Sequence, residues 1–263
     1  RRELALSASV GIALSPEDAN DAAALIAAAE AASQQAHDEG GNRLRFYSTE
    51  MNALVLTRLS LQAELRRALL RGEFELHYQP LLSARGHRLL GAEALVRWRH
   101  PKRGLLAPDM FIEEMDRLGM IEDLDRHVLE RACREARQWR ARDDGELAVA
   151  VNISTRSFQR EHFPELVRAV LASTGLTPQR LELEVVESSA LEDIDRATEC
   201  LTRLRALGVR VSLDDFGTGF SSLNHLRRLP VDALKIDRSF AEEVQVDARA
   251  AAIVIATITL AHS

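Results

Sequence analysis

Along most of the chain, the spacing of apolar residues switches repeatedly between a period typical of strands and one typical of helices. From residue 73 onward, short stretches with alternating apolar and polar positions are followed by longer stretches with helical spacing. The expected strands are 74–80, 92–98, 147–153, 181–187, 209–215 and 233–237. The expected helices are 108–119, 121–141, 161–173, 193–207, 219–228 and 247–261. Strands that alternate with helices are typical of a parallel sheet with right-handed crossovers. We therefore predict an α/β fold: a TIM-like (β/α) barrel with six strands present, or alternatively an open doubly wound sheet.

The first part of the chain has a different pattern. A strand at 4–14, an Ala-rich helix at 21–38 and a short strand at 43–47 make a small α+β piece, followed by an amphipathic helix at 50–71. So short a piece buries too little surface to form a core alone. The predicted organisation is a domain fragment at 1–47, a linker helix at 48–72 and the main domain at 73–263.

Polar side chains interrupt the apolar strands, mostly near their C-terminal ends. Since side chains alternate between the two faces of a strand, Glu93, Leu95 and Arg97 share one face. The other polar strand residues are Gln79, Asn152, Glu184, Asp214, Asp215 and Lys235. In a barrel, the C-terminal ends of the strands meet at the catalytic face. We therefore expect Glu93, Asn152, Glu184 and the Asp214–Asp215 pair to form one cluster, with Lys235 beside it.

Four carboxylates in one cluster repel each other. Two like charges ~4 Å apart cost roughly 4 kcal/mol at an effective dielectric of ~20. Protonation, several cationic partners or bound metal would relieve this repulsion. Oxygen ligands with one amide suit Mg²⁺ or Mn²⁺ rather than zinc, and Asp214–Asp215 could bridge two ions. For any single residue, the simpler interpretation is a helix cap or a paired charge; a pattern over five strands is harder to explain so.

Composition narrows the possible partners. The formal charge of −6 disfavours binding to a nucleic acid polymer, which requires a basic surface. Two distant cysteines, Cys133 and Cys200, predict neither a disulfide framework nor a zinc site, which fits a reducing cytoplasm. The apolar stretch at 250–261 is too short to cross a membrane, so no membrane segment is expected in this chain.

A series of motifs, in order along residues 73–263, resembles the EAL domain family. The motifs are Tyr78-Gln79-Pro80, Glu93-Ala94-Leu95-Val96-Arg97-Trp98, Val151-Asn152-Ile153-Ser154, Glu184-Val185-Val186-Glu187-Ser188, Asp214-Asp215-Phe216-Gly217-Thr218-Gly219-Phe220-Ser221-Ser222 and Lys235-Ile236-Asp237-Arg238-Ser239-Phe240. The tripeptide Glu93-Ala94-Leu95 has little value alone, but the ordered set is highly specific.

The resemblance implies a TIM-like barrel that hydrolyses cyclic di-GMP to pGpG with two Mg²⁺ or Mn²⁺ ions. The metal ligands it implies are Glu93, Asn152, Glu184, Asp214 and Asp215, of which Glu93 and Asp214 are also counted as catalytic. Lys235 would position or polarise the attacking water. The substrate-binding residues would be Gln79, Leu95, Arg97 and Asp237, with Arg97 on a phosphate. Glu187 would support the loop 216–222.

Three departures from the family pattern stand out. Val186 and Phe220 replace the usual Thr and Tyr, so two hydroxyl groups are missing. The sequence also ends at Ser263, before the family's acidic seventh strand and its eighth strand. We therefore expect a barrel that is incomplete at its C-terminal end, and we expect activity of a longer protein that carries these strands.

Residues 1–47 resemble the C-terminal end of a GGDEF domain, a diguanylate cyclase fold, through Ser9–Ala13 and Gly40–Arg43. Glu30, Gln34 and His37 replace the family's usual Asp, Tyr and Lys, which favours a degenerate scaffold. For the main domain, the alternatives to the enzyme are a catalytically silent cyclic di-GMP receptor and a dimerising scaffold. A homodimer is expected in any of the three.

Overall fold

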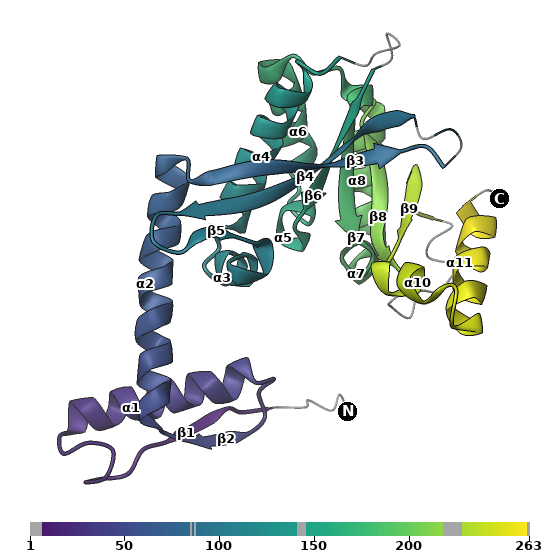
Figure 1. Ribbon diagram of the computed structural model, residues 1–263. Coiled ribbons are helices and arrows are strands. Elements are labelled where there is room, and N and C mark those ends of the chain that lie inside the picture. Colours follow the sequence, from purple (N-terminus) through teal and green to yellow (C-terminus); the bar gives the residue numbers. More distant parts are fainter. Residues whose placement is uncertain (1–6, 85, 87, 141–145, 218–227, 262–263) are drawn as a thin grey trace. The chain divides into compact units, whose positions relative to one another are not determined.

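The structure, a computed structural model, describes residues 7–84, 86, 88–140, 146–217 and 228–261. The chain divides into two compact units, Arg1–Arg67 and Ala68–Ser263. Helix α2 (Thr49–Arg71) contains the point of division (Figure 1). This division does not test the limits of the three segments predicted from the sequence, which remain a prediction.

The first unit contains two short parallel strands packed on one helix. Its elements are β1 (Val10–Ile12), α1 (Ala22–Asp38) and β2 (Leu44–Phe46), with Val10 opposite Leu44. The Asp21 side chain accepts a hydrogen bond from the Ala24 N–H and so caps α1. A Cβ at Gly11 would lie 1.9 Å from the Ala29 carbonyl oxygen, so only glycine allows the strand this close to the helix.

The second unit contains a sheet with the order β3-β4-β6-β7-β8-β9, to which β5 adds by pairing with β4. The strands are β3 (Phe74–Leu82), β4 (Leu89–His100), β5 (Gly104–Leu106), β6 (Ala148–Ile153), β7 (Leu181–Val186), β8 (Arg210–Phe216) and β9 (Ala233–Ile236). From β4 to β9 every neighbour on this path is parallel. The predicted strands are thus found, with ends that differ by a few residues.

The first strand is a correction to the predicted parallel sheet. β3 runs antiparallel to β4, with Gln79 opposite Glu93. Their connection is short: the Ser83 N–H donates to the Arg88 carbonyl across it. A parallel pair requires a crossover of roughly a dozen residues or more, so this connection allows only a hairpin. Gln79 therefore meets Glu93 across a hairpin, and not because two strands share a C-terminal edge.

Helices cover the outer face of the sheet, and three of them, α4, α6 and α8, pack side by side (Figure 1). The helices of this unit are α3 (Ile112–Arg117), α4 (Ile121–Ala136), α5 (Thr155–Phe158), α6 (Phe163–Thr174), α7 (Glu187–Glu192), α8 (Ile194–Ala206), α10 (Arg238–Glu243) and α11 (Ala248–Ala261), with 3-10 turns η1 (Pro108–Met110) and η2 (Pro178–Arg180). β5, α5, α7 and α10 were not predicted, because pieces this short give little periodicity.

The core between helices and sheet is apolar, as the alternation predicts. Trp98 packs with Phe74 and Phe111 at ring distances of 5.8 and 6.0 Å, and all three are nearly inaccessible. The opposite face of the same strands carries the polar residues. This arrangement leaves the carboxylates and Lys235 together on the inner face of the sheet.

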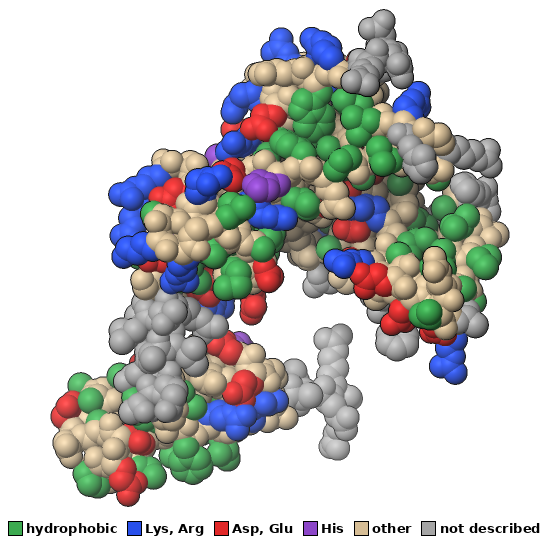
Figure 2. Space-filling model, in the orientation of Figure 1, with side chains coloured by type: hydrophobic (Ala, Val, Ile, Leu, Met, Phe, Trp, Pro, Cys, Tyr) green, Lys and Arg blue, Asp and Glu red, His purple; other side chains and the backbone are tan. Residues whose placement is uncertain are grey.

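The sheet formed by the described residues is open, with β3 and β9 at its two ends, so no closed barrel is seen in them. The helix expected at 219–228 falls almost entirely outside the described residues. α11 exposes Ile253, Ile255 and Ile258, and hydrophobic side chains are visible over this helix in Figure 2. Among the described helices, none is long and apolar enough to cross a membrane.

Candidate active site

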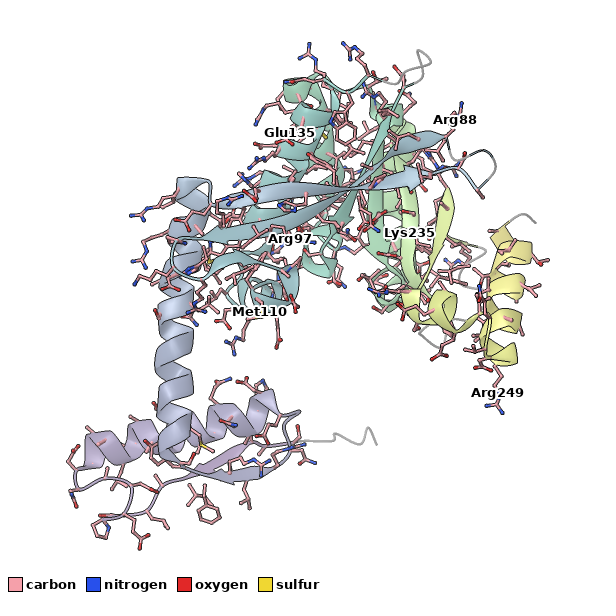
Figure 3. The ribbon with its side chains drawn as sticks, viewed as in Figure 1. Arg88, Arg97, Met110, Glu135, Lys235 and Arg249 are labelled. Atoms are coloured by element: carbon pink, nitrogen blue, oxygen red, sulfur yellow. The ribbon has the colours of Figure 1, made fainter. Side chains whose placement is uncertain are left out.

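Three carboxylates surround one ammonium group on the inner face of the sheet. The Lys235 Nζ lies 2.6 Å from Glu184 Oε2, 3.3 Å from Glu93 Oε2 and 3.5 Å from Asp214 Oδ2. These residues come from four different strands, β4, β7, β8 and β9. Figure 3 labels Lys235 on β9 at the middle of this unit. The structure therefore brings together residues that are up to 142 positions apart.

Asn152 extends the cluster on β6. Its Nδ2 donates a hydrogen bond of 2.8 Å to Glu93 Oε1. In the register of the parallel strands, Asn152 is opposite Glu184, whereas Glu93 is opposite Ala150. The polar residues thus follow a diagonal across the strands, which is the stagger that tilted strands of a barrel require. A single carboxylate, that of Glu93, receives both the amide of Asn152 and the ammonium of Lys235.

Burial and charge shift the pKa values of the central pair. Burial raises the pKa of Glu184 to about 7, although Lys235 acts in the opposite direction. Burial alone would lower the pKa of Lys235, but Glu184, Asp214 and Glu93 together raise it. Lys235 is thus held protonated among an excess of carboxylates. At neutral pH, Glu184 is near the point where it gains or loses its proton.

Asp214 and Asp215 form a bulge between β8 and β9. Leu213 is opposite Leu234 and Phe216 is opposite Ile236, so β8 has one more residue than β9 between these pairs. Asp215 has a φ of 56°, in the left-handed region that only a few per cent of non-glycine residues adopt. Bulges redirect side chains and are common next to active sites. Here the bulge interrupts the alternation of side chains between the two faces of β8. The two consecutive carboxylates of Asp214 and Asp215 therefore both lie near the site.

Asp215 interacts with the carboxyl group of Asp237. Burial raises the pKa of Asp215, and the negative charges of Asp214 and Asp237 raise it further. Asp237 caps α10, where its Oδ1 accepts hydrogen bonds from the Ser239 N–H and hydroxyl, and these bonds lower the pKa of Asp237. The two carboxyl groups therefore titrate as an interacting pair, with the pKa of Asp215 raised and that of Asp237 lowered.

Glu187 contacts the chain immediately after the bulge. Its side chain is 3% exposed, and its Oε2 accepts a hydrogen bond of 3.1 Å from the Gly217 N–H. The contact has the geometry of the predicted loop support at the described end of loop 216–222. Phe220 and the rest of that loop up to residue 222 fall outside the described residues.

Three of the four predicted substrate-binding residues lie on β3 and β4, whereas the fourth, Asp237, follows β9 and caps α10. Gln79 is exposed opposite Glu93, and Leu95 and Arg97 continue the same face of β4. The Arg97 Nη1 donates to the Val96 carbonyl at 2.8 Å, and Figure 3 labels Arg97 on β4. No contact between these residues and the Lys235 cluster is seen in the described residues, apart from the position of Gln79 beside Glu93.

The chemistry of the donors fits a hard cation, but their spacing here is set by Lys235. Glu93, Glu184 and Asp214 offer carboxylate oxygens and Asn152 an amide oxygen, which is the donor type that Mg²⁺ and Mn²⁺ prefer. Among the described residues, no group of three Asp, Glu, His or Cys side chains is close enough to hold a metal ion by itself. The three carboxylates converge instead on the ammonium group.

One buried carboxylate near the site was not predicted from the sequence. Asp125 on α4 is 8% exposed and accepts a hydrogen bond of 3.1 Å from the Ser154 N–H and another from its hydroxyl. A signal was present, because Asp125 interrupts the apolar stripe formed by Ile121, Leu124, Val128 and Leu129. A charge inside such a stripe requires a partner.

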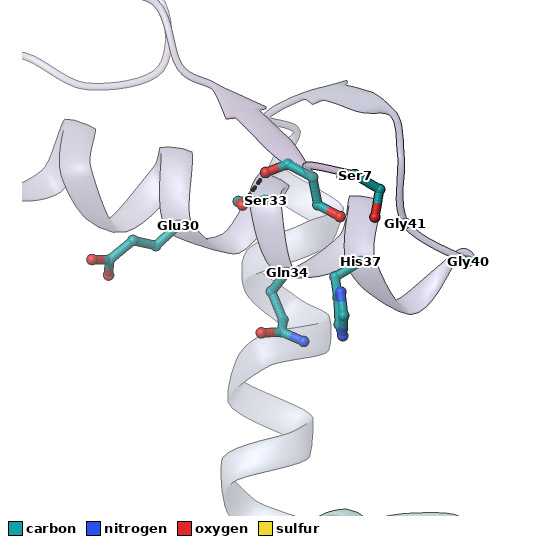
Figure 4. Close-up of a pocket in the computed structure, with 8 residues that line it drawn as sticks. Ser7, Glu30, Ser33, Gln34, His37, Gly40 and Gly41 are labelled. Carbon is teal, nitrogen blue, oxygen red and sulfur yellow. Dashed lines mark hydrogen bonds between the residues drawn. The ribbon is translucent and has the colours of Figure 1, made fainter. Parts of the chain in front are cut away.

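The first unit has a cavity of its own. It measures about 720 Å³ and is lined by Ser7, Ser9, Glu30, Ser33, Gln34, His37, Gly40 and Gly41 (Figure 4). The Ser33 hydroxyl donates to the Ser9 carbonyl at 3.2 Å. Glu30, Gln34 and His37, the residues that depart from the GGDEF pattern, thus line one cavity. The GGDEF resemblance itself stays a prediction.

Comparisons with known proteins agree with this geometry. The model of the EAL domain family matches residues 62–263. Over its full length, the chain is 41% identical to MucR, a bifunctional diguanylate cyclase/cyclic di-GMP phosphodiesterase of Pseudomonas aeruginosa. The match covers 38% of MucR. It is also 43% identical to NbdA, a cyclic di-GMP phosphodiesterase of the same organism. This match covers 99% of the chain and 33% of NbdA. The chain thus spans about a third of the length of these curated relatives.

A solved structure gives the same result at the level of the fold. The PaMucR phosphodiesterase in complex with c-di-GMP aligns with 77% of this chain and 82% of its own, at 42% identity and a TM-score of 0.73. The family match covers the sheet, its helices and every polar residue of the Lys235 cluster. The chain belongs to the EAL domain family.

Proposed function

We propose that this EAL domain hydrolyses cyclic di-GMP to linear pGpG. The observation that carries the proposal is the group of Glu93, Glu184 and Asp214 around Lys235 on the inner face of the sheet. The names of MucR and NbdA, and the c-di-GMP complex of PaMucR, support cyclic di-GMP as the substrate. Each position that the family pattern assigns to the metal site before residue 263 keeps its oxygen-bearing side chain.

The excess of negative charge supports a divalent cation. Three carboxylates meet one ammonium group, and burial raises the pKa of Glu184 to about 7. A bound divalent cation would add the positive charge that keeps Glu184 ionised at neutral pH. We propose that Glu93, Asn152, Glu184, Asp214 and Asp215 hold Mg²⁺ or Mn²⁺, two ions in all. When bound, such ions supply Lewis-acid stabilisation of the phosphate oxygens.

The protein groups have separate roles in this proposal. Lys235, held protonated by its three carboxylate neighbours, orients the attacking water and stabilises negative charge that develops on phosphate. Gln79, Leu95 and Arg97 bind the dinucleotide along β3 and β4, with the Arg97 guanidinium on a phosphate. Asp237 binds at the other side, at the end of β9. Glu187 keeps the chain after Asp215 in place through Gly217. The predicted homodimer remains a prediction.

A turnover assay tests the function. Cyclic di-GMP is incubated with Mg²⁺ or Mn²⁺ and with the 263-residue chain, and in parallel with a longer form that carries the family's last two strands. Glu93→Ala removes the carboxylate that contacts both Asn152 and Lys235, so loss of pGpG production is expected. Glu182→Gln, on the same strand as Glu184, is the matched control and should retain turnover. A chelator of divalent metal ions should abolish turnover by the parent protein.

The outcome also separates the enzyme from a receptor. Binding of cyclic di-GMP by calorimetry, with no pGpG formed by either form of the protein, would contradict the enzyme and support a silent receptor. Turnover that survives Glu93→Ala would contradict the assignment of this cluster as the active site.

A further inference from the structure

Asp125 is a buried carboxylate on α4 whose hydrogen bonds end on the segment after β6. The Ser154 N–H donates to its Oδ2 at 3.1 Å, and the Ser154 hydroxyl donates to the same oxygen. Burial raises the pKa of Asp125, while hydrogen bonds from Ser154 and Ser157 act in the opposite direction. A carboxylate held this deep is costly unless such donors satisfy it, so the contact is a specific one.

Ser154 decides where β6 stops and α5 begins. Its Oγ accepts a hydrogen bond from the Ser157 N–H, so Ser154 is the N-cap of α5. It lies two residues after Asn152, whose amide donates to Glu93 in the Lys235 cluster. Because Ser154 is fixed through both its backbone and its side chain, the strand end that carries Asn152 has little freedom to rotate.

The other contacts of α5 and of the turn before α6 include ion pairs at the surface and one hydrogen bond to α7. Arg156 pairs with Asp116 and Arg160 with Glu122, both at 2.9 Å and largely exposed. Exposed pairs of this kind contribute little to rigidity. The Thr155 hydroxyl contacts Ser189 on α7, the helix that begins with Glu187. Asp125 is thus the buried anchor of a turn that touches two elements of the site.

We propose that Asp125 is a positioning residue for the reaction: from α4 it fixes the end of β6 so that the Asn152 amide faces Glu93. Its carboxylate touches neither substrate nor Lys235 in the structure, and it acts through Ser154. The effect on turnover rests on the proposed function. The effect on the Asn152 amide does not.

The first test is the side-chain amide resonance of Asn152 in an ¹H–¹⁵N spectrum, assigned by its absence in Asn152→Ala. In Asp125→Asn, which keeps the size but replaces one acceptor by a donor, this resonance should move towards that of a free amide. Asp123→Asn is the matched control on the same helix, because Asp123 is exposed and pairs only with Arg126 among the described residues. An Asn152 resonance unchanged by Asp125→Asn would overturn the proposal. If Asp125→Asn does not fold, Ser154→Ala, which removes one of the two donors, replaces it.

The second test is a double-mutant cycle on cyclic di-GMP turnover. Asp125→Asn should lower kcat by about 10- to 100-fold, the usual effect of removing a residue that orients a metal ligand. In the Asn152→Ala background, the same substitution should lower kcat by less than about threefold, because the residue through which it acts is gone. Fully multiplicative effects would mean that Asp125 does not act through Asn152 and would overturn the proposal. If the parent protein has no turnover, the proposed function fails and the Asn152 resonance alone decides the role of Asp125.

Discussion

The ammonium of Lys235 and the carboxylate of Glu184 lie 2.6 Å apart, and Glu184 is only 2% exposed. Glu93 and Asp214 share the same ammonium at 3.3 and 3.5 Å. One cation therefore faces three acids and balances only part of their charge. Because Lys235 is the common partner, its removal has to affect all three at once.

Lys235→Met should leave three carboxylates facing each other without a cation. We expect cyclic di-GMP turnover to fall by ~10²- to 10³-fold, the range for loss of one group that stabilises developing negative charge. The free energy of unfolding at pH 8 should fall by ~3 kcal/mol, since breaking a buried pair strands the remaining charge. At pH 5 the loss should be smaller, because Glu184 can take up a proton. Urea unfolding at both pH values measures this, with the exposed Lys102→Met as control. Equal losses at both pH values would contradict it.

Glu184 should make the stability of the metal-free protein depend on pH. The pKa of a glutamate is ordinarily 4.5, and burial raises that of Glu184 to about 7 in the fold. Between these values the folded state binds the proton more tightly than the unfolded state does, so stability falls as pH rises from about 4.5 to about 7. Glu184→Gln lacks the titrating carboxyl group. Its free energy of unfolding relative to that of the parent should therefore rise as the pH increases across that window. Lys235 titrates above the window because its pKa is raised.

Urea unfolding without metal, at pH 5 and pH 8, measures the difference between the parent and Glu184→Gln. Glu182→Gln is the control on the same strand and should show no such trend. Excess Mg²⁺ should reduce the difference by keeping Glu184 ionised. If the parent and Glu184→Gln respond to pH in parallel, Glu184 is not the titrating group.

Alternation, together with the position of polar residues near the C-terminal ends of the strands, predicted a cluster of Glu93, Asn152, Glu184 and Asp214 beside Lys235. These residues lie close together in the structure, while their roles remain a prediction. Alternation works here because burial on the outer face fixes the register of each strand, so the polar face follows. It could not give the bulge, since the conformation of Asp215 depends on pairing with β9.

Other features depended on contacts that are distant in sequence. The antiparallel β3 required the length of its connection to be weighed, and the short elements α5, α7 and α10 have too few residues for a periodic signal. Asp125 interrupts the apolar stripe of α4, which indicates that it has a buried partner but does not identify that partner. Its burial depends on Ser154, 29 positions away, which no local pattern reveals.

Glu187→Ala should disturb the chain after Asp215. It removes the acceptor of the Gly217 N–H, and we expect the free energy of unfolding to fall by ~1–3 kcal/mol. Turnover should fall as well, because Asp214 and Asp215 lie directly before Gly217. Glu187→Gln keeps an amide oxygen at the same place and should retain more of both. Thermal unfolding and initial rates measure the two effects; if the Gln variant is as impaired as the Ala variant, the carboxylate charge and not this hydrogen bond is what matters.

Arg180 should stabilise the fold without serving the reaction. It is 8% exposed, and its guanidinium donates to the Leu147 carbonyl at 2.9 Å and to the Ala136 carbonyl at 2.5 Å, at the N-terminal ends of β6 and β7. That edge is opposite to the one where a barrel performs catalysis. Arg180→Met keeps the apolar stem but leaves two carbonyl groups without this donor, so the free energy of unfolding should fall by ~2–4 kcal/mol. Turnover per folded molecule should remain unchanged.

Arg140→Met is the matched control for Arg180→Met. Arg140 also donates to two backbone carbonyls, those of Arg137 and Trp139, but it is exposed, so water can replace its hydrogen bonds. Its loss should change the free energy of unfolding by less than ~0.5 kcal/mol. Urea unfolding and turnover, both corrected for the folded fraction, distinguish the two variants. A loss of turnover in Arg180→Met with unchanged stability would contradict the purely structural role, because it would connect the N-terminal edge of the sheet to the carboxylates around Lys235.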